Sequence, residues 1–169
     1  MGNHCLSDSD CATDKETRIS IAGFVLCSMG VPISWKSKGM KSVTLSSSEA
    51  ECVALSEAAK EVKFVHQVLG SADLNVQLPI VIRVDNIGAI FVSENVAVSQ
   101  RTKRVDCRLK FVQEFVFDGF IKIIFVRSGD NDSDSFTENL GSELHERHSD
   151  KMIIEKGNEE QRIEKVVLN

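Results

Sequence analysis

Residues 46–69 read SSSEAECVALSEAAKEVKFVHQVL, and this stretch decides the fold. No proline or glycine interrupts it before Gly70, and the S-x-x-E spacing at its start, in Ser46–Glu49 or Ser48–Glu51, is typical of a helix N-terminus. Steps of three and four residues connect one apolar stripe, formed by Leu55, Ala58, Val62, Val65 and Leu69. We therefore predict one long amphipathic helix, closed by a cap at Gly70.

The same stripe, extended backwards by four residues, reaches Glu51. A carboxylate is therefore expected on the core-facing side of the helix, whereas Glu49 and Glu57 point elsewhere. The helix alone leaves two interpretations open. Glu51 is either a solvated residue near the positive end of the helix dipole or a buried functional carboxylate.

Composition and charge narrow the class of protein. With 169 residues, 42% hydrophobic and 27% charged, the sequence is typical of one soluble globular domain. It has no apolar run near the roughly 20 residues of a membrane span and no secretory signal. Five cysteines without a C-x-x-C pair favour reduced thiols in an intracellular, cytoplasmic protein, with no disulfide-linked partner and no zinc site. The net charge of −5 excludes a generally basic surface but permits a local basic stripe that binds nucleic acid.

The order of elements predicts the fold class. Strands are expected at 4–10, 20–29, 33–36, 80–84 and 120–126, and further helices at 87–94, 106–117 and around 134–140. Short turns between the first three strands favour an antiparallel meander, and helical crossovers favour two parallel strands. We predict an α/β fold with a five-stranded mixed sheet flanked by helices. Residues 1–142 form this domain, and residues 143–169 form a charged extension that is helical or disordered.

Four acidic residues stand at the ends of these predicted elements: Asp8, Glu51, Asp85 and Asp134. Asp85 follows a buried strand directly, at the edge where open α/β sheets bind ligands. Each acid alone can be a cap or a turn residue, but four buried carboxylates would repel one another without a cation. Oxygen-only ligands favour Mg²⁺ or Mn²⁺, and two such ions about 4 Å apart suit phosphodiester hydrolysis.

Several motifs carry a family resemblance: SDSD (7–10), ISWKSK (33–38), LSSSEAECVALSEAAKE (45–61), VDNIGAI (84–90), SQRTKRVDCRLKFVQEFVFDG (99–119) and SGDNDSDSFTENL (128–140). In this order they resemble the ribonuclease H domain of copia-type retrotransposon Pol polyproteins, through about Leu140. The resemblance implies a ribonuclease H-like fold and cleavage of the RNA strand of an RNA–DNA hybrid. It also implies other portions of a Pol polyprotein as partners.

The resemblance assigns the four acids as catalytic metal ligands of two Mg²⁺ or Mn²⁺ ions. Asp8 would bridge the ions, Glu51 and Asp85 would hold one of them, and Asp134 the other. Asp10 is the rival to Asp8, and Asp132 is the rival to Asp134. The expected contacts to nucleic acid are Lys36, Lys38, Lys41, Asn86, Arg101, Lys103 and Arg104.

The sequence also departs from the family pattern. The closing motif usually reads Ala-Asp-hydrophobic-Phe-Thr-Lys, whereas residues 133–138 read SDSFTE, which places Glu138 where a cation is expected. A second hypothesis is therefore a decayed domain that binds nucleic acid or a partner without cutting. A third is another metal-dependent nuclease of the same fold that prefers DNA. The sequence argues against a serine hydrolase, since it has no G-x-S-x-G motif.

Overall fold

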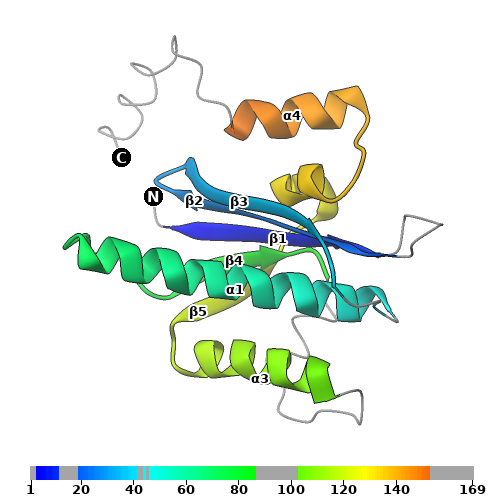
Figure 1. Ribbon diagram of the computed structural model, residues 1–169. Coiled ribbons are helices and arrows are strands. Elements are labelled where there is room, and N and C mark those ends of the chain that lie inside the picture. The colour runs from blue at the N-terminus through cyan, green and yellow to red at the C-terminus, as the bar shows by residue number, and fades with distance from the viewer. Residues whose placement is uncertain (1–2, 12–18, 42–43, 45, 87–102, 153–169) are drawn as a thin grey trace, which may run out of the picture. The chain divides into compact units, whose positions relative to one another are not determined.

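The computed structural model describes residues 3–11, 19–41, 44, 46–86 and 103–152. Two compact units divide between Asn139 and Leu140. The strands of the first unit are His4–Asp10 (β1), Ile21–Ser28 (β2), Val31–Gly39 (β3), Ile80–Val84 (β4) and Ile121–Phe125 (β5). They form one five-stranded sheet in the order β3-β2-β1-β4-β5 (Figure 1). The first three strands pair antiparallel, and β4 runs parallel to both β1 and β5, which confirms the predicted mixed sheet.

The long helix α1 spans Ser47–Ser71. Its N-terminal cap is Ser46, whose side chain accepts a hydrogen bond of 3.2 Å from the backbone N–H of Glu49. The predicted apolar stripe faces the sheet, and Leu55, Ala58 and Val62 are fully buried there. The prediction of a cap at Gly70 is wrong. The helix ends at Ser71, because the N–H of Ala72 turns back to the carbonyl of Leu69.

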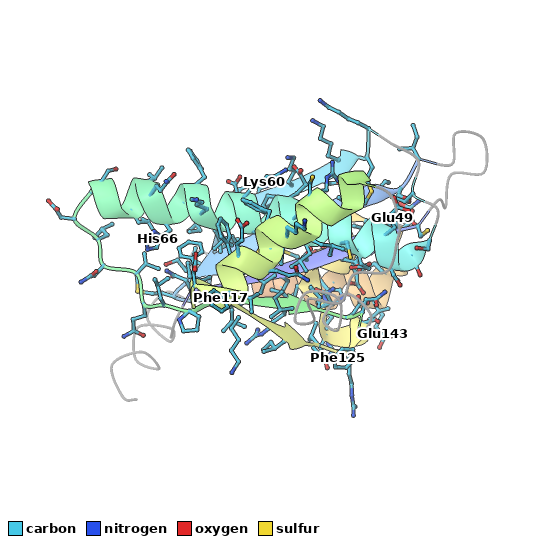
Figure 2. The ribbon with its side chains drawn as sticks, turned by 90° about the horizontal axis from the view of Figure 1, so that it is seen from below. Glu49, Lys60, His66, Phe117, Phe125 and Glu143 are labelled. Carbon is cyan, nitrogen blue, oxygen red and sulfur yellow. The ribbon has the colours of Figure 1, made fainter. Side chains whose placement is uncertain are left out.

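The second helix of this layer, α3, spans Lys103–Phe117 and packs against α1. Figure 2 shows α3 crossing α1, with Phe117 at the end of α3. The Lys63 ammonium of α1 lies 4.7 Å from the ring centroid of Phe115. Helix α3 begins three residues before the predicted 106, and the helix predicted at 87–94 lies outside the described residues.

The opposite face of the sheet carries a short 3₁₀ helix, η2, at Asp132–Phe136. Along β2, Phe24 faces the core beneath α1, so its neighbour Gly23 faces η2. A Cβ at Gly23 would lie 2.7 Å from Cγ2 of Thr137, a distance that real Cβ atoms do not show. Glycine at this position therefore allows the 131–137 segment to lie directly on the sheet.

The α-helix predicted around 134–140 is wrong. The 3₁₀ helix η2 occupies the first part of this range, and another 3₁₀ turn, η1, precedes it at Ser128–Asp130. One contribution is local, because the side chain of Ser135 bonds to the carbonyl of Asp132 at 2.8 Å. Such short polar side chains compete with the α-helical hydrogen-bond ladder.

The second unit contains helix α4, at Ser142–Met152. Part of the charged extension expected at 143–169 is therefore helical, and residues 153–169 lie outside the described part of the chain. None of the helices in the described residues is long and apolar enough to cross a membrane.

Candidate metal centre

A fork between two parallel strands creates the candidate site. The pairing of β1 with β4 stops at Leu6 opposite Arg83, whereas the pairing of β1 with β2 continues to Asp10. Asp8 therefore lies beyond the point where β1 and β4 part, and Asp85 follows the last residue of β4. Both side chains stand at the carboxyl ends of adjacent parallel strands, where open sheets place their ligands.

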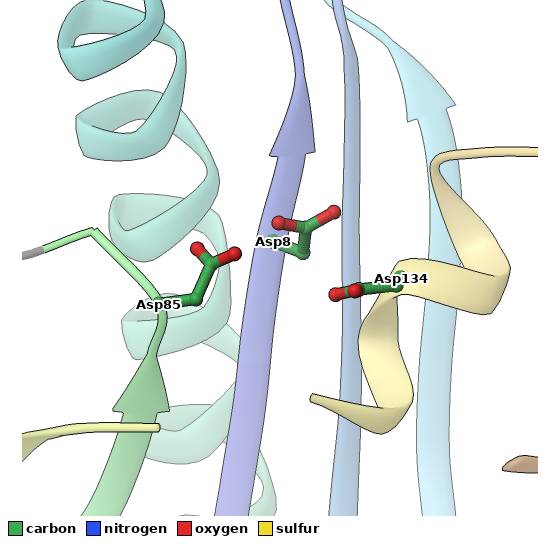
Figure 3. A group of neighbouring side chains, drawn as sticks. All are labelled: Asp8, Asp85 and Asp134. Atoms are coloured by element: carbon green, nitrogen blue, oxygen red, sulfur yellow. The ribbon is translucent and has the colours of Figure 1, made fainter. Parts of the chain in front are cut away.

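A third acid, from a distant part of the chain, completes a cluster at this fork. Asp8, Asp85 and Asp134 each offer one carboxylate oxygen, and these oxygens all lie within 4.8 Å of one another (Figure 3). The three residues, here called the carboxylate cluster, come from β1, the end of β4 and η2. Among the described residues the rivals Asp10 and Asp132 are not part of the cluster.

Glu51 lies beside the carboxylate cluster but is not one of its three members. Its side chain is buried at the start of α1, and Oε1 accepts hydrogen bonds from the backbone N–H of Ser9 at 3.1 Å and from the Ser9 hydroxyl at 2.7 Å. The other oxygen, Oε2, is buried and has no hydrogen-bond partner among the described residues. The structure thus brings three of the four predicted acids together and holds the fourth next to them.

Hydroxyl groups fix two members of the cluster. The Thr137 hydroxyl donates to Oδ2 of Asp8, and the Ser128 hydroxyl donates to Oδ2 of Asp85 at 2.8 Å. Asp134 differs, since its Oδ1 is buried without a partner among the described residues. Sequence reasoning missed these two hydroxyls and Ser9. The only signal for Thr137 was its place in the closing motif, three residues after Asp134.

Burial and mutual repulsion shape the acidity of the site. Loss of hydration on burial raises the pKa of Asp8 to about 6, and the charge of Asp85 adds to this effect. Burial likewise raises the pKa of Glu51 and of Asp134 to about 8, in both cases with repulsion from Asp8 and Asp85. When these groups are all ionised, their mutual repulsion destabilises the fold unless a counter-charge is present.

The donor set fits a hard divalent cation. It consists of carboxylate oxygens, two of which are buried without a hydrogen-bond partner among the described residues, at Glu51 and Asp134. Mg²⁺ and Mn²⁺ prefer such oxygen ligands, and zinc prefers nitrogen and sulfur. Divalent cations held by these residues would supply the missing partners and offset the repulsion among the acids.

The predicted nucleic-acid contacts are only partly described. Lys36, Lys38 and Lys41 line one pocket between the edge of the sheet and α1, where Lys36 also pairs with Glu57 at 3.4 Å. Asn86 follows Asp85 directly, at the fork. Arg101 lies outside the described residues, as do the side chains of Lys103 and Arg104 in the first turn of α3. Arg108, which lines the same pocket as the three lysines, was not predicted.

The chain is similar in sequence to polyproteins of plant transposons. It is 34% identical over 132 residues to the retrovirus-related Pol polyprotein from transposon TNT 1-94 of Nicotiana tabacum, which covers 78% of this chain. It is 29% identical over 151 residues, 89% of this chain, to that from transposon RE1 of Arabidopsis thaliana. The chain spans 10% of the length of each relative. No family model matches it.

Solved structures agree on the fold. LC11-RNase H1, isolated from compost by a metagenomic approach, superposes with a TM-score of 0.59 at 12% identity, over 80% of this chain and 92% of that protein. Its complex with an RNA/DNA hybrid gives a TM-score of 0.56 at 11% identity, over 80% and 93%. The homologues of this chain are thus retrovirus-related Pol polyproteins of copia-type transposons, and its fold is that of ribonuclease H.

Proposed function

We propose that this ribonuclease H-like chain is a metal-dependent endonuclease that cuts the RNA strand of RNA–DNA hybrids. The observation that carries the proposal is the carboxylate cluster at the β1–β4 fork, with buried Glu51 beside it. The complex of the structurally similar LC11-RNase H1 with an RNA/DNA hybrid supports the choice of substrate. The other segments of a Pol polyprotein are the proposed protein partners.

Asp8, Glu51, Asp85 and Asp134 would hold Mg²⁺ or Mn²⁺. When bound, such ions lower the pKa of an attacking water and stabilise the charge that develops on the leaving oxygen. The chain's own contribution is to hold the acids in place before substrate arrives. Thr137 orients Asp8, Ser128 orients Asp85 and Ser9 orients Glu51. Asp134 keeps one oxygen unengaged by the described residues and therefore available to an ion.

The lysines beside α1 would contact the phosphates of the hybrid. Lys38 and Lys41 are exposed, and Lys36 is half-buried against Glu57. Arg101, Lys103, Arg104 and Asn86 remain proposed contacts from the sequence alone. Preference for the RNA strand would come from 2′-hydroxyl groups, which distinguish RNA from DNA at a given position.

The test is incubation of the chain with a labelled RNA–DNA hybrid, with Mg²⁺, with Mn²⁺ and with EDTA. We expect metal-dependent cleavage of the RNA strand, and Asp85→Asn should lower its rate at least about a hundredfold. Asparagine keeps the size of the side chain and an oxygen for Ser128, so the variant should fold. Asp118→Asn, at an exposed position after α3, is the matched control and should cut like the unaltered chain.

Glu138 favours a second candidate, a domain that binds the hybrid without cutting it. Burial has the largest effect on the pKa of Asp8 and of Asp134. The nearby negative charge of Glu138 raises both pKa values further. An extra anion there also repels the phosphate of a substrate. Binding of the hybrid without any metal-dependent product would favour this candidate. Cleavage of duplex DNA in preference to the hybrid would instead indicate a DNA nuclease of the same fold.

A further inference from the structure

Asn131 lies between the 3₁₀ helices η1 and η2, and its side chain is completely buried. It occupies the N-cap position of η2, where an asparagine usually accepts a hydrogen bond from a backbone N–H of the helix that follows. Here the side chain makes no such bond to η2, all of whose residues the structure describes. The short helix therefore lacks its usual side-chain cap, and the amide is engaged elsewhere.

The amide of Asn131 is directed at strand β1. Its Nδ2 donates to the backbone carbonyl of Ser7 at 3.3 Å, and its Oδ1 accepts from the Ser133 hydroxyl at 2.6 Å. A carbonyl can only accept, so the contact with Ser7 fixes which way round the amide lies. Ser7 follows Leu6, the last residue of β1 that pairs with β4. Asn131 therefore bonds to β1 at the point where β4 leaves it, directly before Asp8.

The backbone of Asn131 connects the other two acids of the carboxylate cluster. Its N–H donates to the carbonyl of Ser128 at 2.9 Å, and its carbonyl accepts from the N–H of Asp134 at 3.1 Å. The Ser128 hydroxyl in turn holds Asp85, at 2.8 Å. Asn131 is thus one hydrogen bond away from Asp134, from the residue that holds Asp85, and from the residue that precedes Asp8.

The three acids stand on separate elements, so hydrogen bonds within one element do not set the distances between them (Figure 3). Their mutual repulsion favours separation when they are ionised. The network of Asn131 resists this separation, because breaking either of its side-chain bonds leaves a buried polar group without a partner. Ser7 and Ser133 are both completely buried, so bulk water does not replace a lost bond there.

We propose that Asn131 is a positioning residue that sets the spacing of the three acids of the carboxylate cluster before an ion binds. This inference rests on the proposed function, because it takes Mg²⁺ or Mn²⁺ as the ligand of these acids. Asn131 contributes no ligand atom itself, since both polar atoms of its side chain are bonded to Ser7 and Ser133. Without the amide, the 128–134 segment would shift relative to β1, and the acids would no longer converge on one ion.

The experiment measures Mn²⁺ binding to the full chain by calorimetry, without nucleic acid and below the melting temperature of each variant. Asn131→Leu nearly keeps the volume of the side chain but removes both its donor and its acceptor. We expect the Mn²⁺ affinity to fall at least about tenfold, as for other groups that orient metal ligands. Ser133→Ala is a milder variant, which leaves the bond from Asn131 to Ser7 in place and should lower the affinity by a smaller factor.

Val112→Ala is the control that separates positioning from stability alone. Val112 is buried in the core on α3, and its truncation leaves a cavity that lowers the melting temperature. This variant should nevertheless bind Mn²⁺ like the unaltered chain. If Asn131→Leu also melts lower and keeps the Mn²⁺ affinity of the unaltered chain, the inference is overturned. If Asn131→Leu does not fold, Ser133→Ala decides, and unchanged affinity in that variant overturns the inference.

A second readout needs no metal. Gly23 of β2 and the methyl group of Thr137 lie close together, since a Cβ at Gly23 would be 2.7 Å from Cγ2 of Thr137. NMR spectra in EDTA should therefore show a cross-peak between the α-protons of Gly23 and this methyl group. Asn131→Leu should weaken the cross-peak, because the segment that follows residue 131 moves away from the sheet, whereas Val112→Ala should leave it unchanged.

The two readouts separate this inference from the proposed function. If the unaltered chain binds Mn²⁺ and cuts the hybrid while Asn131→Leu keeps its affinity, the proposed function stands and the role of Asn131 falls. If the unaltered chain neither binds Mn²⁺ nor cuts, the proposed function falls and the cross-peak decides. Its loss in Asn131→Leu would then still support Asn131 as the residue that holds the acids together, and an unchanged cross-peak would overturn that role.

Discussion

The carboxylate cluster and the pocket lined by Lys36, Lys38, Lys41 and Arg108, here called the cationic pocket, are built on different elements and hold charge in different surroundings. Asp8 is 6% exposed and Glu51 is 5% exposed, and each meets other acids. The Lys36 side chain in the pocket is 39% exposed, and Lys38 and Lys41 are also exposed. The buried acids are unfavourable without a counter-ion, whereas the solvated cations cost the fold little. We infer that the cluster depends on bound cations for stability as well as for activity. The pocket contributes to binding alone and does not need its ligand for stability.

The largest expected effect is a fall in stability of the metal-free chain as the pH rises. The pKa of Asp8 is about 6 in the fold against 3.8 normally, and that of Glu51 about 8 against 4.5. The folded chain thus holds more protons than the unfolded chain between about pH 4 and pH 8, so the stability present below pH 4 is lost across this window. From Asp8 alone the loss is at most about 3 kcal/mol, at about 1.36 kcal/mol per pKa unit.

Thermal melting in EDTA from pH 4.5 to pH 8.5 measures this loss. Mg²⁺ should restore stability, by about 2.7 kcal/mol at a free concentration one hundred times Kd. Asp134→Asn should flatten the pH profile and abolish the gain from Mg²⁺, because it removes a half-buried anion whose Oδ1 is buried and has no partner among the described residues. Lys38→Ala should leave the profile unchanged. A profile in EDTA that rises toward pH 8 would contradict the contrast between the two regions.

A smaller effect is expected from Gly23→Ala. The new Cβ would meet Cγ2 of Thr137 at 2.7 Å and Cβ of Phe136 at 3.0 Å, so the 131–137 segment must move away from the sheet. We expect a loss of about 1–3 kcal/mol in the free energy of unfolding, measured by urea titration. Titration of Mn²⁺ by calorimetry should show weaker binding as well.

The same variant tests whether the two faces of the sheet are independent. Ala22 and Phe24, on either side of Gly23, point to the other face and line the cationic pocket. Binding of the hybrid in EDTA should therefore stay within about twofold of the unaltered chain. A loss of hybrid binding of more than about fivefold would show that the two regions are coupled.

The smallest effect is expected at Thr137, which we regard as a positioning residue for Asp8. Thr137→Val keeps the shape of the side chain but removes the hydroxyl that donates to Asp8. Mn²⁺ affinity, measured by calorimetry without nucleic acid, should fall about tenfold, as for other groups that orient metal ligands. Thr137→Ser keeps the hydroxyl and should restore most of the affinity. Equal affinity in the valine and serine variants would remove Thr137 from this role.

Local periodicity was enough to predict most of the sheet and to place Glu51 on the core-facing side of α1, but it left open whether Glu51 is solvated or buried. The stripe of α1 repeats within a single element, and Asp85 stands at the end of a short apolar run, so both could be located without knowledge of the remaining chain. The mixed sheet followed from the order of strands and helices in the same way.

The 131–137 segment could not be predicted, because its conformation depends on residues far away in the sequence. Thr137 and Asp8 are 129 residues apart, and their hydrogen bond exists only because Gly23 leaves space between them. Ser37 of β3 also donates to the carbonyl of Phe136, at 2.5 Å. Arg108 was missed for a similar reason, since only the crossing of α3 over α1 places it beside the lysines of β3.

The two oxygens of Glu51 have separate tasks. Oε1 joins the start of α1 to β1 through two donors of Ser9, and this leaves Oε2 as the one atom that an ion can reach. Glu51 would therefore offer a single free oxygen, Oε2, to an ion. A glutamine at this position could keep the attachment to Ser9 and would then direct an amide NH₂ at the neighbouring acids. The contact between α1 and β1 would survive, while the amide group in place of Oε2 would repel a cation.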